Sequence, residues 1–98
     1  MVQHIVLWKL ADTAAGADKA TNARLMKEKL EALVGVIPGL LEATVGFNFN
    51  GGTYDVALTT RFTDREALAV YADHPAHVEV KSFVHAVATE RTCVDCEL

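Results

Sequence analysis

Positive charge is scarce and unclustered in this chain of 98 residues, where nine Lys and Arg stand against 13 Asp and Glu. Nucleic acids and anionic membranes bind through clustered Lys and Arg side chains, so the sequence excludes both as partners. Long apolar runs are also missing, because none approaches the roughly 18 residues that a membrane-spanning helix needs. The N-terminus begins in a strand-like segment without a signal-peptide pattern, and we therefore expect a cytoplasmic protein.

Cysteine is limited to Cys93 and Cys96, whose spacing occurs both in redox pairs and in half of a zinc site. In an extended strand, residues three apart lie roughly 10 Å apart and point to opposite faces, beyond the roughly 7 Å limit for a disulfide. A zinc site would need further ligands. We therefore predict two reduced thiols, with no bound metal and no cofactor.

The short length of the chain limits how much apolar surface it can bury. Ninety-eight residues are enough for a single domain over residues 1–98, which buries only about 60 to 70 % of its surface on folding. Hydrophobic residues nevertheless make up 51 % of the chain. Some apolar surface is therefore expected to be covered by a partner chain.

Side chains that can transfer protons concentrate in residues 68–78, where Tyr71, His74 and His77 surround Pro75. Pro75 cannot continue a helix but fits the first turn of a new one, so this stretch predicts a corner between two helices. Tyr71 would close the first helix and His77 would open the second. The exposed N–H groups and the dipole at a helix N-terminus disfavour imidazolium, so His77 is expected to be neutral at pH 7.

Two other interpretations of the corner stay open. Tyr71 and His77 can be ordinary packing residues, with His74 satisfying backbone groups where the helices meet. A divalent metal on Asp73, His74 and His77 is disfavoured, because the proline corner breaks the regular helical spacing of a His pair.

Hydrophobic periodicity predicts the order strand, helix, strand, strand, helix, helix, strand. The strands are expected over residues 3–10, 41–48, 54–62 and 88–97. A helix is expected over about residues 18–36, a second after a capping box at residues 63–66, and a third after Pro75. Residues 12–16 are expected to form a loop of small residues, and residues 50–52 a hairpin connection.

The expected helices have distinct faces. Along the first, the apolar stripe comprises Met26, Leu30, Leu33, Val34 and Ile37, and the solvated face comprises Arg24, Lys27, Glu28 and Glu31. On the third, the spacing of His77, Val80, Val84 and Val87 places His77 at the head of the apolar stripe, facing inward. His85 falls to the side and is expected at the surface.

The expected strands give a four-stranded antiparallel sheet covered on one face by helices. The first strand is apolar on both faces, which indicates a central position. The uncovered face is expected to pack against the same face of a second subunit about a two-fold axis. The last strand contributes Arg91, Cys93 and Asp95 to one side, which the pattern does not assign.

Several features together resemble the stress-responsive A/B barrel (Dabb) family. They are His4 in the first strand, Ile37-Pro38-Gly39, Tyr54-Asp55, the Tyr-x-x-His-Pro-x-His corner at residues 71–77, and Val94-Asp95. The resemblance spans nearly the whole chain. It implies an α+β, ferredoxin-like βαββαβ fold that pairs into a dimeric α+β barrel, with a pocket between sheet and helices.

The resemblance implies a homodimer with a small apolar or phenolic ligand in that pocket. Ligand contacts are expected from the residues His4, Val6, Trp8, Leu58 and His74. The role expected first is binding, or a stress-related function that needs no catalysis.

Two enzymatic alternatives accompany this expectation. One plant branch of the family is a polyketide cyclase, in which the histidine matching His77 is the base and the tyrosine matching Tyr71 assists. In a cyclase or isomerase of this kind, His77 would remove a proton while Tyr71 hydrogen-bonds the developing oxyanion. Related α+β barrels also suggest a cofactor-free or haem-dependent monooxygenase with His4, His74 or His77 as a possible ligand.

Overall fold

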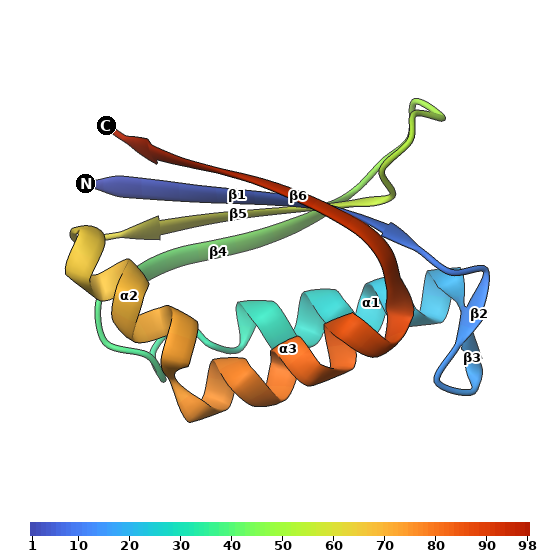
Figure 1. The fold of residues 1–98 in the computed structure, drawn as a ribbon, viewed down its shortest axis with the longest axis horizontal. Helices are drawn as coiled ribbons and strands as arrows, with labels where there is room; N and C mark the ends of the chain where they lie inside the picture. Colours follow the sequence, from blue (N-terminus) through green and yellow to red (C-terminus); the bar gives the residue numbers. More distant parts are fainter.

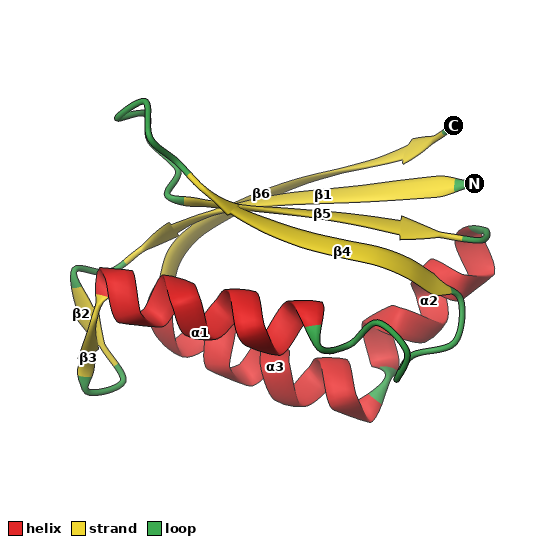
Figure 2. Ribbon diagram, turned by 180° about the vertical axis from the view of Figure 1, so that it is seen from behind, coloured by secondary structure: helices red, strands yellow, loops and turns green.

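A four-stranded antiparallel sheet with three helices on one face dominates the computed structural model, which describes residues 1–98 (Figure 1). The strands lie in the order β4-β5-β1-β6. Their bounds are β1 Val2–Leu10, β4 Leu40–Phe47, β5 Val56–Phe62 and β6 Ala88–Glu97. The helices are α1 Lys19–Glu31, α2 Arg65–Asp73 and α3 Pro75–Val87. The predicted ferredoxin-like fold is confirmed, and Figure 2 shows that no helix covers the opposite face of the sheet.

Strand β1 is central, as predicted, because it pairs antiparallel with both β5 and β6. Val6 and Trp8 point toward the helices and are buried, whereas Ile5 and Leu7 on the other face are only half-buried. β5 alternates in the same way, and its buried side chains include Leu58 and Phe62. The core therefore lies between one face of the sheet and the helices.

Helix α1 ends earlier than the predicted helix over residues 18–36. Gly35 has a φ of +87°, which an α-helix does not allow, and residues 32–36 form turns instead. Leu33 and Ile37 are still buried, but Val34 is 40 % exposed and does not belong to the apolar stripe.

Lys27 and Glu31, which were assigned to the solvated face of this helix, are half-buried because they also bond to β4. The Glu31 carboxylate accepts hydrogen bonds from the Lys27 ammonium (2.7 Å) and from the Val45 backbone N–H (2.9 Å). Lys27 also donates to the Val45 carbonyl oxygen (2.8 Å). Since β4 is an edge strand, these side chains satisfy backbone groups that no neighbouring strand can reach.

The two connections differ from the predicted loops. Residues 12–16 contribute to a small hairpin of β2 (Thr13–Ala14) and β3 (Ala17–Asp18), whose turn residues Ala15 and Gly16 both have positive φ, as a type I′ turn requires. The connection between β4 and β5 spans residues 48–55 and is longer than the predicted hairpin at residues 50–52.

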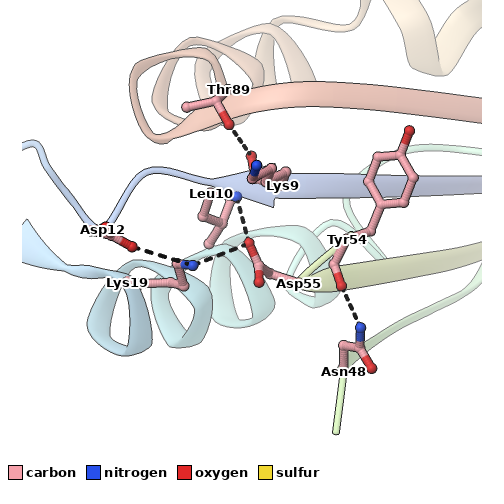
Figure 3. A network of polar contacts seen from close by, with 8 residues as sticks. All are labelled: Lys9, Leu10, Asp12, Lys19, Asn48, Tyr54, Asp55 and Thr89. Carbon is pink, nitrogen blue, oxygen red and sulfur yellow. Dashed lines mark hydrogen bonds and ion pairs between the residues drawn. The ribbon is translucent and has the colours of Figure 1, made fainter. Parts of the chain in front are cut away.

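Asp55 explains why β5 begins at Val56 rather than at Tyr54 (Figure 3). Its carboxylate accepts a hydrogen bond from the Leu10 backbone N–H (2.8 Å) and lies 3.6 Å from the Lys19 ammonium. Its own N–H donates to the Trp8 carbonyl oxygen (2.8 Å). Asp55 thus ties the connection to the end of β1, so the Tyr54-Asp55 pair has a structural role here.

The predicted corner between α2 and α3 is confirmed, with Pro75 in the first turn of α3. The capping box was misplaced by one residue, because Asp64 rather than Thr63 is the N-cap of α2 and accepts from the Ala67 N–H (2.8 Å). Gly39 leads into β4 with a φ of +83°, and a Cβ there would lie 2.5 Å from that of Ala67. Only glycine therefore fits where the chain passes under α2. No helix in the chain is long and apolar enough to cross a membrane.

Candidate functional site

A cavity of about 410 Å³ lies between the sheet and the helices. Its lining residues are His4, Val6, Trp8, Leu30, Leu58, Leu68, Tyr71, Ala72, His77, Lys81, Val84, His85, Arg91, Cys93 and Asp95. The structure thus brings together six of the seven residues that the sequence selected for the site, the exception being His74.

Tyr71, in the last turn of α2, is only 2 % exposed and lies among other rings. Its ring is stacked on that of His77, with 3.9 Å between centroids and 25° between planes, and meets Phe62 edge-on at 5.0 Å. Burial raises the pKa of Tyr71 to about 12, although the Arg91 guanidinium acts in the opposite direction. The phenol therefore stays protonated and can donate a hydrogen bond at neutral pH.

His77, in the first turn of α3, is half-buried against Tyr71. Burial is the main cause that lowers the pKa of His77, and the positive charge of Lys81 acts in the same direction. The direction agrees with the prediction of a neutral imidazole. Nδ1–H donates to the Ala72 carbonyl oxygen at 3.4 Å, which leaves Nε2 as the proton acceptor.

His4 is held by a partner from the neighbouring strand. His4 of β1 and Asp95 of β6 are directly paired in the strand register, and His4 Nδ1 is hydrogen-bonded to the Asp95 carboxylate. Because a carboxylate only accepts, Nδ1 carries the proton of this hydrogen bond. The His4 side chain is 12 % exposed and its ring lies 6.4 Å from that of Tyr71, edge to face.

His74, expected among the ligand contacts, does not line the cavity. It is both the C-cap of α2 and the N-cap of α3, and its Nδ1 accepts from the Ala76 backbone N–H (3.1 Å). The ring is used in the corner itself, in agreement with the alternative in which His74 satisfies backbone groups.

Nine lining residues were not selected from the sequence, and three of these are basic. Lys81 and His85 follow His77 at intervals of four residues on α3, so helical spacing could have placed them on the same face. His85 is exposed, as predicted, and it also lines the cavity. Arg91 shares the cavity face of β6 with Cys93 and Asp95, which resolves the side that the pattern left unassigned.

The cysteines do not share one environment. Cys93 lines the cavity, whereas Cys96 does not, as expected for residues three apart on a strand. Both are free thiols. No group of three or more His, Cys, Asp or Glu side chains is arranged to hold a metal ion.

Comparison with solved structures gives a close relative and more distant neighbours. A dimeric protein of unknown function with a ferredoxin-like fold from Bacteroides fragilis is 36 % identical, with a TM-score of 0.88 over 99 % of this chain and 95 % of that one. A hydroxynitrile lyase from Passiflora edulis is 15 % identical, with a TM-score of 0.78 over 97 % and 90 % of the two chains. An antibiotic biosynthesis monooxygenase is 12 % identical, with a TM-score of 0.77 over 100 % and 98 %. The last two share the fold alone.

Family comparison agrees with this likeness. No curated protein matches the chain. The family model of the stress-responsive A/B barrel domain matches residues 2–98, which is nearly the whole sequence. The chain therefore belongs to the stress-responsive A/B barrel domain family.

Proposed function

We propose that the chain is a homodimeric enzyme of cyclase or isomerase type, which binds a small carbonyl compound and uses His77 as general base. The observation that carries this proposal is the stacked pair of His77 and Tyr71 on the wall of a largely apolar cavity. An imidazole with a lowered pKa accepts a proton at neutral pH, and a phenol with a raised pKa keeps its own.

The two groups serve complementary steps. His77 Nε2 removes an acidic C–H proton next to the carbonyl, and the Tyr71 hydroxyl donates a hydrogen bond to the enolate oxygen that forms. No hydrogen bond within the chain engages that hydroxyl, so it is free to bind the oxyanion. Burial disfavours the imidazolium, which then returns its proton to another atom of the bound compound. In a conjugated enolate, return of the proton to the far carbon shifts the double bond and gives isomerisation. In an aldol ring closure, the enolate carbon attacks a second carbonyl of the same compound, the C=O π bond breaks, and the proton returns to the resulting alkoxide.

His4 has a positioning role in this scheme. The Asp95 carboxylate fixes its tautomer, so that Nε2 accepts a hydrogen bond from a hydroxyl group of the ligand. The apolar walls favour return of the proton from His77 rather than directly from water, and the half-buried His77 exchanges its own proton with solvent.

Hydrogen–deuterium exchange of phenylacetone in D₂O tests the base. We expect the protein to accelerate loss of the benzylic CH₂ signal in the proton NMR spectrum. His77→Gln should slow the catalysed exchange by about 100-fold or more, the scale of general-base catalysis. His74→Asn is the matched control, because it removes a histidine outside the cavity and keeps a good N-cap residue.

An equal rate for the wild type and His77→Gln would contradict the assignment. If the protein binds aromatic ketones without accelerating exchange, the cavity is a binding site only, which was the role expected first from the sequence.

The homodimer is part of this proposal. Ile5 and Leu7 of β1, together with Ala57 of β5 and Val94 of β6, give the uncovered sheet face an apolar centre. The relative from Bacteroides fragilis is described as dimeric. The connection of residues 48–55 projects beyond this face and carries Phe49, which is 99 % exposed (Figure 1).

A further inference from the structure

Basic side chains gather at the cavity although the chain as a whole is acidic. Lys81, His85 and Arg91, which we call the basic rim, all line the cavity and are exposed. Asp95 is the only carboxylate among the fifteen lining residues, and it is engaged by His4. The formal net charge of the chain is −4, so this local excess of positive charge does not follow from composition.

The three residues of the basic rim are neighbours. Lys81 and His85 lie one turn apart on the same face of α3. His85 and Arg91 also share a second, shallower hollow of about 290 Å³ with Trp8, Ala88, Thr89 and Glu90, which places Arg91 of β6 across from α3. The basic rim therefore combines residues of α3 and β6, the two elements that border the cavity on this side.

The two permanent cations of the basic rim have no partner within the chain. Lys81 and Arg91 take part in none of the ion pairs, which instead use Lys19, Lys27, Arg61, Arg65 and His4. Glu90 precedes Arg91 in the chain and also lines the second hollow, but it forms no ion pair with Arg91. Both charges nevertheless act on groups in the cavity. Arg91 opposes the rise in the pKa of Tyr71, and Lys81 lowers the pKa of His77.

Apolar side chains make up much of the remaining wall and include the only tryptophan of the chain. Val6, Trp8 and Leu58 line the sheet side, and Leu30, Leu68 and Val84 line the helix side. A ligand that fits such a site has an apolar body and one end that accepts hydrogen bonds from cations.

From this arrangement we infer that the ligand of the cavity is a small apolar carboxylate, whose anionic group binds the basic rim and whose body packs against Trp8 and Leu58. The inference rests on the proposed function, since it names the substrate class of the same cavity. Arg91 offers the planar pair of donors that matches a carboxylate, and Lys81 adds a second positive charge.

Binding of 2-naphthoate compared with 2-naphthamide tests the inference. The two probes have nearly the same shape, but only the first is charged. Calorimetry, with Trp8 fluorescence as a second signal, should show that the wild type binds naphthoate at least tenfold more tightly than naphthamide. The double variant Lys81→Gln/Arg91→Gln should bind both probes with nearly equal affinity.

A second double variant on α1, Arg24→Gln/Lys29→Gln, is the control. It removes two positive charges from exposed positions outside the cavity and should keep the full preference for naphthoate. The inference is overturned if the wild type binds naphthamide as tightly as naphthoate, if neither probe binds, or if the preference survives in Lys81→Gln/Arg91→Gln.

Failure of the proposed function gives a different result. Naphthoate has no acidic C–H next to a ketone, so its binding does not depend on proton removal. If the protein prefers naphthoate but does not accelerate hydrogen–deuterium exchange of phenylacetone, the carboxylate site is supported and His77 is not the base. If the exchange of phenylacetone depends on His77 but naphthoate is not preferred, His77 is the base and the carboxylate site is wrong.

Discussion

The Tyr71 side chain combines packing and chemistry, since its ring contacts Phe62 and His77 while its hydroxyl has no partner in the chain. Tyr71→Phe keeps the ring and removes only the hydroxyl, so the free energy of unfolding should change by less than about 1 kcal/mol. The catalysed exchange of phenylacetone should fall, because the enolate loses its hydrogen-bond donor. Urea unfolding followed by circular dichroism and the exchange assay measure the two effects.

Tyr71→Ala is the contrasting variant. Loss of a buried aromatic ring should lower the free energy of unfolding by about 3 to 5 kcal/mol. An equal loss of stability in Tyr71→Phe would mean that the hydroxyl is needed for folding rather than for binding the ligand.

Individual site residues could be predicted where local spacing decides their position. The corner at Pro75 and the apolar stripe of α3 depend on residues a few positions apart. The corner placed His77 at the start of α3, and the stripe placed its side chain facing inward. The hydrogen bond between His4 and Asp95 joins residues 91 positions apart and depends on the register of β1 with β6, which no local pattern contains. His74 could not be assigned, because a ligand contact and a helix cap need the same kind of side chain.

At the level of elements, α1 stabilises the edge strand β4 through Glu31, whose carboxylate accepts from Val45 and Lys27. Glu31→Ala should lower the free energy of unfolding by about 1 to 2 kcal/mol, because the Val45 N–H loses a charged acceptor. Glu28→Ala is the matched control on the same helix and should change it by less than about 0.5 kcal/mol, since that side chain is exposed.

The effect of Glu31 should depend on pH. The hydrogen bonds from Lys27 and Val45 lower the pKa of Glu31 below its ordinary value of 4.5. A group whose pKa is lowered by folding stabilises the native state fully above its unfolded pKa, and this contribution is lost as the pH falls through the folded value. The difference between wild type and Glu31→Ala in urea unfolding should therefore be larger at pH 7 than at pH 3. A difference independent of pH would contradict this role of the carboxylate.

The order and type of the main elements could be predicted, but their ends could not. Strands with alternating burial and the amphipathic α3 carry their own signal in sequence. The end of α1 depends on a backbone turn that reaches a positive φ at Gly35, which hydrophobic periodicity does not reveal. The start of β5 depends on the tertiary hydrogen bonds between Asp55 and β1. The β2–β3 hairpin was missed for the same reason, since Asn22 of α1 holds it by donating to the Ala14 carbonyl oxygen (2.9 Å).

For the whole molecule, the sheet face without helices determines the proposed assembly. Light scattering at micromolar concentration should give twice the chain mass of 10.6 kDa. Ile5→Lys should give a folded monomer, because Ile5 lies at the centre of this face between Thr59 and Val94. Val78→Lys introduces the same charge at an exposed position of α3 and should remain dimeric. A wild-type monomer under these conditions would exclude the sheet-to-sheet dimer.

The protonation of His77 in the native protein tests the proposed chemistry most directly. A ¹⁵N NMR titration measures it, with each of the four histidines identified by single substitution. We predict that His77 titrates below its ordinary pKa of 6.5, and that its neutral form carries the proton on Nδ1. A pKa above 7 would contradict the account, because His77 would then be an imidazolium at neutral pH and could not remove a proton from a bound ligand.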